Sequence, residues 1–127
     1  MLIEHMALNV PDPAEMADWY AQLGFQVVRA AETPVPVRFI RQTRTGFTLE
    51  LYRNADSALD LLASLTPVAL HLAFATTDPS SQRDALVELG AVVEKDFHTT
   101  PEGDSIVMLR DPWGLPIQLV RRAGGQL

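Results

Sequence analysis

An internal repeat constrains the fold of this chain more than any other feature. Residues 5–13, HMALNVPDP, return at residues 71–79 as HLAFATTDP, an offset of 66. Near the end of each half, residues 45–53, TGFTLELYR, correspond to residues 113–121, WGLPIQLVR, at an offset of 68. A fixed period of this kind indicates one supersecondary unit used more than once. The sequence therefore predicts two similar modules.

The repeat places similar polar residues at equivalent points of both halves. Each half has a histidine near its start, His5 in the first and His71 in the second. Each half also has a carboxylate or an amide near its end, Glu50 in the first and Gln118 in the second. Imidazole nitrogens and side-chain oxygens are common ligands of divalent metals. These four residues are therefore candidate metal ligands.

Composition narrows the class of protein. The chain has 127 residues, 47% of them hydrophobic, which suits one domain with a substantial core. It has no cysteine, so disulfide and thiolate chemistry are excluded and a cytoplasmic location is expected. The formal net charge of −6 argues against nucleic-acid binding. No apolar run reaches the roughly 20 residues of a membrane span, so no membrane partner is expected.

Local patterns predict the same order of elements, βαβββ, in both halves. In the first half, strands are expected at residues 2–10, 25–30, 35–41 and 47–53. In the second half, strands are expected at residues 68–75, 91–97, 105–110 and 115–121. We expect a single domain made of a first module at about residues 1–53, a linker at about 54–67 and a second module at about 68–122. The last stretch, from residue 121 to 127, is expected to form a loose tail.

Each half also carries start and stop signals for a helix after its first strand. Asp12 and Asp78 suit the N-cap position, and each precedes a proline, which suits the first helical position. Gly24 and Gly90 are expected to end the helices. Helical spacing predicts core positions for several residues in the two helices: Met16, Trp19, Tyr20, Leu23, Leu86 and Leu89.

Alternation along the strands separates the aliphatic side chains from the four candidate ligands. Leu49 and Leu51 share one face of their strand, and Glu50 and Tyr52 lie on the other. The same alternation puts Gln118 opposite the aliphatic residues of its own strand. The aliphatic face is expected to pack under the helices. The other face, where small residues neighbour the candidates, has room for a cavity.

Other polar residues receive structural interpretations. His98 is expected in a surface loop at residues 97–103, and a substrate contact is the less favoured interpretation. Arg38, Arg41 and Arg110 are candidates for binding an anionic substrate, but a solvated sheet edge is the favoured position.

Two stretches carry a resemblance to a known family. DPWGLPIQLVRR at residues 111–122 is similar to a closing Asp-Pro-x-Gly-x-x-Ile-Glu-Leu motif, and HMALNVPDPAEMADWYAQLGF at residues 5–25 is similar to the opening of the same family. The family is the vicinal oxygen chelate superfamily, which includes glyoxalase I, methylmalonyl-CoA epimerase, extradiol dioxygenases, and fosfomycin and bleomycin resistance proteins. The resemblance implies an α+β fold in which two βαβββ modules form a cupped mixed sheet around a metal.

The resemblance also implies roles for individual residues. By position, His5, Glu50, His71 and Gln118 match the four ligand positions of the family. The metal is divalent, with Ni, Co, Zn, Mn and Fe all open. Most relatives have Glu at the position of Gln118, which is a neutral ligand and no strong base, so Glu50 is the expected proton-transfer base. The expected substrate contacts are Tyr52, Asn9 and Asn54.

The implied function is that of a metal-dependent isomerase or lyase. It acts on a small oxygen-chelating carbonyl substrate by enediolate-type proton transfer. Many relatives carry an arginine at the position of Asn9 that holds a glutathione carboxylate, so a glutathione adduct is disfavoured. Two alternatives stay open: a non-heme iron dioxygenase, and a metal-free binding protein for a drug or other small molecule. A homodimer is expected, with the site within one chain or across two.

Overall fold

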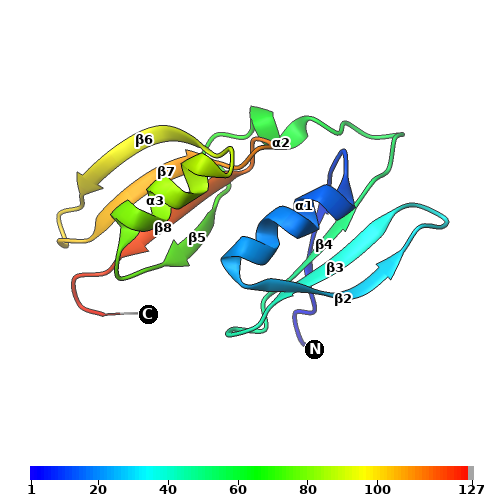
Figure 1. The fold of residues 1–127 in the computed structure, drawn as a ribbon, viewed down its shortest axis with the longest axis horizontal. Helices are drawn as coiled ribbons and strands as arrows, with labels where there is room; N and C mark the ends of the chain where they lie inside the picture. The colour runs from blue at the N-terminus through cyan, green and yellow to red at the C-terminus, as the bar shows by residue number, and fades with distance from the viewer. Residues whose placement is uncertain (126–127) are drawn as a thin grey trace. The chain divides into compact units, whose positions relative to one another are not determined.

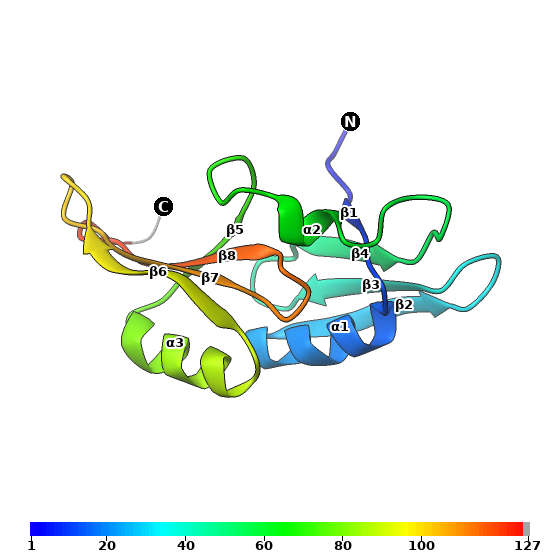
Figure 2. The same ribbon diagram turned by 90° about the horizontal axis from the view of Figure 1, so that it is seen from above.

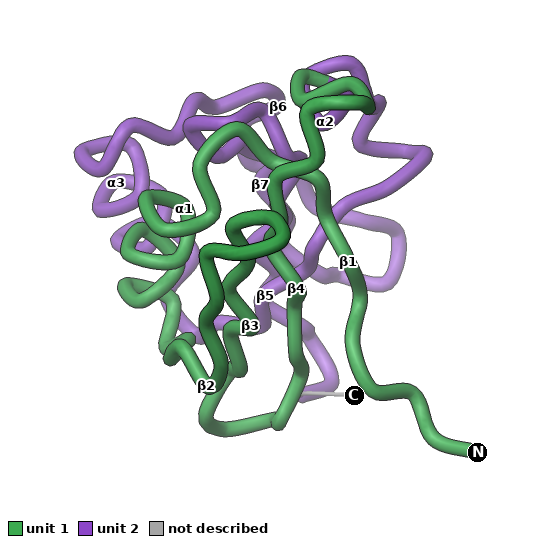
Figure 3. Tube along the Cα trace, turned by 90° about the vertical axis from the view of Figure 1, so that its right-hand side faces the viewer, with its two compact units in different colours: residues 1–60 green, residues 61–127 purple. Residues whose placement is uncertain are grey.

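The computed structural model describes residues 1–125 and divides the chain into two compact units, Met1–Asp60 and Leu61–Leu127 (Figure 3). The division falls inside the stretch expected as a linker, while the single-domain organisation stays a prediction. The last two residues of the expected tail, Gln126 and Leu127, lie outside the described residues. Arg121, the first residue of that tail, is the last residue of a strand instead.

Unit 1 has the predicted order of elements (Figure 1). They are β1 (Met6–Asn9), α1 (Pro13–Tyr20), a short 3₁₀ helix (Ala21–Leu23), β2 (Phe25–Ala31), β3 (Val37–Gln42) and β4 (Thr48–Tyr52). The sheet order is β1-β4-β3-β2, with β1 parallel to β4 and the other pairs antiparallel. Helix α1 packs against β2, β3 and β4.

Unit 2 repeats this arrangement after a short helix (Figure 1). Its elements are α2 (Leu61–Ser64), β5 (Leu72–Ala75), α3 (Pro79–Glu88), β6 (Val92–Thr99), β7 (Ser105–Arg110) and β8 (Pro116–Arg121). The sheet order is β5-β8-β7-β6, with β5 parallel to β8. Figure 2 shows each long helix lying against one face of the sheet of its own unit. The predicted pair of βαβββ modules is therefore confirmed, with one four-stranded mixed sheet in each.

The predicted starts of both helices are confirmed because the capping residues act as expected. The carboxylate of Asp12 accepts hydrogen bonds from the backbone N–H groups of Ala14 and Glu15, both at 3.0 Å. Asp78 accepts one from the N–H of Ser81 at 3.1 Å. Such caps satisfy backbone donors that the first helical turn leaves without partners. Gly24, which follows the 3₁₀ helix, has a positive φ of 81°, a conformation that glycine adopts at little cost.

The core of each unit lies between its helix and its sheet. In unit 1 the side chains of Met16, Tyr20, Leu49 and Leu51 are fully buried. In unit 2 the corresponding sheet residues are Ile117 and Leu119, and Leu86 comes from the helix. Of the predicted core residues, Met16, Tyr20 and Leu86 are confirmed as buried, whereas Trp19 and Leu23 are half-buried. Leu89 is 42% exposed and lies one residue beyond the end of α3.

Two predicted strands are shorter than the alternation pattern indicated. Strand β1 begins at Met6 rather than at residue 2, and β5 begins at Leu72 rather than at residue 68. The length of each strand is limited by the parallel strand beside it. β4 begins at Thr48 and β8 begins at Pro116, so pairing with β1 and β5 cannot start earlier. His5 and His71 therefore each lie one residue before a strand.

Strand β6 is longer than predicted. His98 was expected in a loop, but it lies in β6 and pairs with Ile106 of β7.

Among the helices that the structure describes, none is long and apolar enough to cross a membrane.

Candidate functional site

Glu50 and Gln118 occupy the same position in the two sheets. Glu50 of β4 lies opposite Ala7 of β1, and Gln118 of β8 lies opposite Ala73 of β5. Each alanine follows the histidine of its half by two residues. Within each unit, the register thus brings one histidine and one oxygen-bearing side chain to the start of the same strand pair. We call each pair a half-site: His5 with Glu50, and His71 with Gln118.

The half-site of unit 1 lies on the face of the sheet that α1 does not cover. Leu49 and Leu51 on either side of Glu50 are fully buried under the helix. The side chain of Glu50 is 25% exposed, and Tyr52, two residues further along the strand, is half-buried as well. Because side chains alternate along a strand, Glu50 and Tyr52 share this open face.

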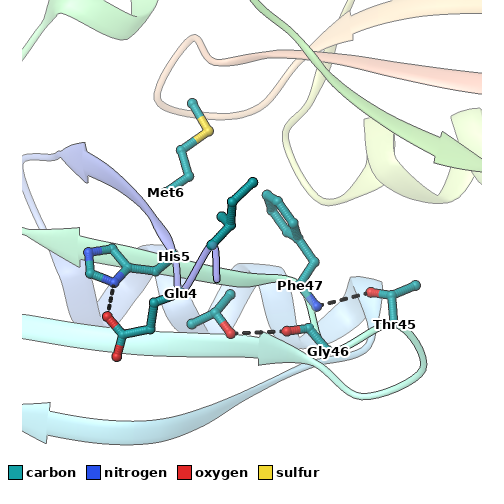
Figure 4. Close-up of a pocket in the computed structure, with 8 residues that line it drawn as sticks. Glu4, His5, Met6, Thr45, Gly46 and Phe47 are labelled. Carbon is teal, nitrogen blue, oxygen red and sulfur yellow. Dashed lines mark hydrogen bonds and ion pairs between the residues drawn. The ribbon is translucent and has the colours of Figure 1, made fainter. Parts of the chain in front are cut away.

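Both ring nitrogens of His5 have carboxylate neighbours. Its Nδ1 lies 2.8 Å from Oε2 of Glu4, a contact drawn in Figure 4. Its Nε2 lies 3.2 Å from Oε2 of Glu50. The edge of the ring also meets Phe39 of β3, with ring centroids 5.3 Å apart. Phe39 is the partner of Glu50 in the sheet register, so these groups form one cluster on the open face.

The donor atoms of this half-site fit a metal ion. The two tautomers of the His5 ring differ at Nε2: one donates a hydrogen bond to Glu50, and the other, with its proton on Nδ1 toward Glu4, directs a lone pair at the oxygen of Glu50. Two acceptor atoms that converge in this way need a proton or a cation between them. Ligand atoms held about 2.1 Å from one tetrahedral or octahedral ion lie about 3.0–3.4 Å apart. The separation of 3.2 Å falls within that range.

The half-site of unit 2 has a similar arrangement of the imidazole. Nδ1 of His71 lies 2.6 Å from the backbone carbonyl oxygen of Pro67, an acceptor that fixes the proton on Nδ1. In the neutral form of this ring, Nε2 is then the nitrogen with the lone pair. Gln118 is half-buried between the buried residues Ile117 and Leu119. Within the described residues, no hydrogen bond joins His71 to Gln118.

Neither unit by itself supplies a complete ligand set of the usual kind. Within the described part of each unit, no three histidine, aspartate or glutamate side chains gather at one metal position. The described part of each unit thus holds two of the four candidate ligands.

A pocket adjoins His5 in unit 1 (Figure 4). Its volume is about 440 Å³, and it lies between the residues that lead into β1 and the turn that leads into β4. In the close-up, Glu4 and His5 lie on one side and Phe47 on the other. The lining residues are Ile3, Glu4, His5, Met6, Thr45, Gly46, Phe47 and Thr48. The lining is mainly apolar, and Glu4 and His5 are its ionisable side chains.

Two of the expected substrate contacts have partners in the chain itself. The amide nitrogen of Asn9 donates to the carbonyl oxygen of Asn54 at 3.0 Å, and its oxygen accepts from the N–H of Asn54 at 2.8 Å. The side chain of Asn54 accepts from the N–H of Asp56 at 3.0 Å. These contacts fix the chain as it leaves β4, beside Tyr52. Asn9 is opposite Tyr52 in the sheet register, so both of these expected contacts lie on the open face that carries Glu50.

The arginines predicted at a solvated sheet edge are elsewhere. All three lie on inner strands: Arg38 and Arg41 on β3, and Arg110 on β7. Arg38 pairs with Glu32 at 2.5 Å. Arg110 pairs with Glu94 and donates to the carbonyl oxygens of Leu65 and Gly114. Arg38 and Arg110 thus have structural partners that the local sequence does not reveal.

Two residues beside His5 were not predicted from the sequence. Glu4 has no counterpart in the repeat, because Leu70 precedes His71, so the repeat gave no signal for it. Phe39 was expected only as part of a strand. Its place beside His5 and Glu50 follows from the pairing of β3 with β4, which is set by distant residues.

Comparisons with known proteins agree with this architecture. A family model described as a glyoxalase-like domain matches residues 5–120. A glyoxalase family protein from Bacillus cereus has a similar structure, with a TM-score of 0.80 at 13% identity, covering 96% of this chain and 94% of that chain. A search of the curated proteins finds no match.

Two further solved structures share the fold at low identity. The fosfomycin resistance protein FosX from Listeria monocytogenes has a TM-score of 0.74 at 15% identity, covering 100% of this chain and 95% of that chain. The antibiotic binding protein TnmS3 from Streptomyces sp. CB03234 has a TM-score of 0.68 at 21% identity, covering 97% of both chains. The fold therefore occurs in both a resistance protein and an antibiotic binding protein.

Proposed function

The chain belongs to the glyoxalase-like domain family, and from this premise we propose that it is a metal-dependent isomerase or lyase. The substrate we propose is a small carbonyl compound with adjacent oxygens. The observation that carries the proposal is the convergence of His5 Nε2 and Glu50 Oε2 at 3.2 Å, with Nδ1 of the same ring directed at another acceptor. That separation suits two ligands of one metal ion, and a proton on Nε2 would join the same two atoms in a hydrogen bond.

The ligands in this proposal are His5 and Glu50 from one half-site and His71 and Gln118 from the other. The two half-sites belong either to the same chain or to two copies of it. A divalent ion on these donors would polarise the substrate carbonyl as a Lewis acid. The Nδ1 contacts with Glu4 and Pro67 orient each imidazole for ligation, a role that outer acceptors commonly have around metal-binding histidines.

Glu50 is the proton-transfer group in this proposal. Of the two oxygen-bearing ligands, it alone is a carboxylate, since Gln118 is an amide and cannot take up a proton near neutral pH. Glu50 is also partly exposed on the open face, so a substrate can reach it. Proton removal from the carbon beside the carbonyl is therefore assigned to the unit 1 side of the site. Tyr52 borders the substrate on the same face, and Asn9 with Asn54 holds the neighbouring loop.

Metal content is the first test. The tag-free protein would be reloaded separately with Ni, Co, Zn, Mn or Fe, and bound metal would be measured by mass spectrometry. We expect about one ion per chain for the wild type and a large loss in H5A and H71A. The third histidine provides the matched control, because His98 lies on β6 outside both half-sites. H98A is expected to keep its metal.

Other outcomes would replace the proposal. Equal metal content in H5A, H71A and H98A would contradict the assigned ligands. Tight binding of an aromatic drug by a protein that takes up no metal would favour the binding-protein alternative. Oxygen uptake by the Fe(II) form with catechols would identify the dioxygenase alternative instead.

A further inference from the structure

The register of unit 1 places four side chains in one row across the sheet. Ala7 of β1 is opposite Glu50 of β4, Glu50 is opposite Phe39 of β3, and Phe39 is opposite Arg29 of β2. Residues that face each other across neighbouring strands point to the same side of a sheet. The row therefore lies on the open face, away from α1, and ends in a cation.

Arg29 reaches this face because β2 is irregular at that point. Val27 pairs with Ile40, which is fully buried on the helix side, so Val27 belongs to the helix side too. In a regular strand Arg29 would share that side, since side chains two residues apart point the same way. The register shifts between Val27 and Arg29, and Arg29 pairs with Phe39 instead. A bulge of this kind redirects one side chain to the other face.

Unit 2 has the same irregularity at the equivalent place. Its row runs from Ala73 to Gln118, then to Met108 and to Lys95. The register shifts between Val93 and Lys95, as it does between Val27 and Arg29. Both halves thus use a bulge to place a cation at the end of the row that contains the candidate ligand. A recurrence at the same point of the repeat marks the bulge as a feature of the module.

The guanidinium of Arg29 is held but not neutralised. Its Cζ lies 5.8 Å from the centroid of the Phe39 ring, a cation–π contact that keeps the group over the open face. In the part of the chain that the structure describes, Arg29 forms no ion pair with a carboxylate. The same holds within this part for Lys95. Arg38 and Arg110, by contrast, are paired with Glu32 and Glu94.

We infer that Arg29 binds an anionic group of the substrate, so that the substrate is a carbonyl compound with a second, acidic end. This inference rests on the proposed function, since it names the substrate class of that site. Arg29 is two strands away from Glu50, which is roughly 10 Å between backbones. The planar guanidinium suits a carboxylate or a phosphate, both of which accept paired hydrogen bonds from arginine. The acidic end therefore lies a few bonds away from the oxygens that chelate the metal.

Ligand binding tests this inference directly. The probes are 2-oxopentanedioate, its terminal monoamide and the analogue with a terminal phosphonate, measured by calorimetry on metal-loaded and metal-free wild type and R29Q. All three probes keep the carboxylate beside the carbonyl, and only the charge of the far end differs. We expect the wild type to bind at least one of the two probes with an anionic far end about tenfold more tightly than the amide, since a charged hydrogen bond contributes about 1.5 kcal/mol or more. R29Q is expected to bind all three alike. The tighter of the two anions identifies carboxylate or phosphate as the natural group.

The matched control is R53Q, which removes the same charge from the same unit directly after β4. R53Q is expected to keep the preference for the anion. The inference is overturned if R29Q keeps the preference, if R53Q loses it equally, or if the wild type does not distinguish the anions from the amide. If R29Q differs from the wild type only in solubility, the charge of Arg29 instead protects the edge strand β2 against aggregation. Metal content, measured on the same samples, separates these results from a failure of the metal site.

Discussion

At the scale of single residues, the main asymmetry between the halves is Glu50 against Gln118. Both sit at the same register position and both are half-buried on an open sheet face. Only the carboxylate can accept a proton, and only the carboxylate would be a negatively charged ligand of a metal ion. The backbone symmetry of the two modules is thus combined with a chemical difference, which is the basis for proposing Glu50 as the proton-transfer group.

We expect Glu50→Gln to lower turnover by about 10²- to 10⁴-fold, the usual contribution of a general base. The measurement is kcat on the best substrate from a panel of 2-oxo compounds and acyl thioesters, together with the thermal midpoint. The fold should be retained because Gln fits the space of Glu. The control is E88Q on α3, which is exposed and should keep full activity. Full activity in E50Q would remove the base assignment.

Asp104 is the buried carboxylate that ties the end of unit 2 to its sheet. Its side chain accepts hydrogen bonds from the N–H of Ala123 at 2.9 Å and from Arg122 at 2.5 Å, and the residue is only 8% exposed. The Ala123 N–H, followed by the Arg122 guanidinium, holds the pKa of Asp104 below its usual value of 3.8. The ionised form is therefore favoured in the folded state.

A lowered folded-state pKa stabilises the protein above the unfolded-state pKa, and this stability is lost as pH falls through the folded-state value. We therefore expect Asp104→Asn to lower the thermal midpoint at pH 7. The difference from wild type should shrink below about pH 4. D60N serves as the control, because Asp60 is an exposed carboxylate. A difference that stays constant from pH 7 to pH 2 would contradict the ionic role.

At the scale of elements, the repeat predicts equivalent turns in the two halves, and the structure gives these turns different surroundings. Gly46 and Gly114 correspond in the repeat, with φ values of 77° and 89°. A Cβ on Gly46 would meet nothing within 4 Å, whereas one on Gly114 would lie 2.6 Å from Cα and Cβ of Ala63. Helix α2, which contains Ala63, therefore needs a glycine at position 114 for its close approach.

The two glycines give a matched pair of variants. Gly46→Ala should cost about 1–2 kcal/mol, the penalty of a left-handed backbone for an L-residue. Gly114→Ala carries that penalty and a clash with backbone, so we expect about 3 kcal/mol or more. Urea unfolding would measure both. Equal losses would mean that α2 moves freely away from the turn.

The elements also explain how much of the fold and site the sequence could predict. The helices were predicted well because Asp12, Asp78 and Gly24 act through neighbours within a few residues. The starts of β1 and β5 were placed too early because the alternation continues beyond the length of the partner strand. Pairing between distant segments sets that length, and no local pattern reports it.

The candidate site shows the same limit. The four ligand candidates were found from the repeat, and strand alternation correctly placed Glu50 opposite the core residues of β4. Arg110 was misplaced because its acceptors, Leu65 and Gly114, come from segments that no local pattern joins to it. The bulge before Arg29 was likewise invisible, since it exists only relative to β3.

At the scale of the whole molecule, we expect a homodimer. Leu2 and Val68 each precede the histidine of their half by three residues, and they are 94% and 97% exposed. Large apolar side chains exposed at equivalent places often mark an interaction surface. The sheets also end in strands with unpaired edges, β1 and β2 in unit 1 and β5 and β6 in unit 2.

Light scattering after gel filtration should therefore give a mass about twice the 14.0 kDa of one chain. The double variant L2Q/V68Q should shift the equilibrium toward the single chain, because it removes apolar area from the interface. V87Q changes an exposed valine on α3 and should leave the mass unchanged. A mass of 14.0 kDa for the wild type at every concentration would refute the dimer.

The bulge shared by β2 and β6 also bears on the history of the molecule. An irregularity at the same point of both modules is most simply inherited from one ancestral gene that already contained it. Such inheritance would place the duplication after the bulge. A protein of one such module, paired with a copy of itself, would have carried identical residues in both halves. The divergence of glutamate from glutamine, and of arginine from lysine, followed once the halves could mutate separately.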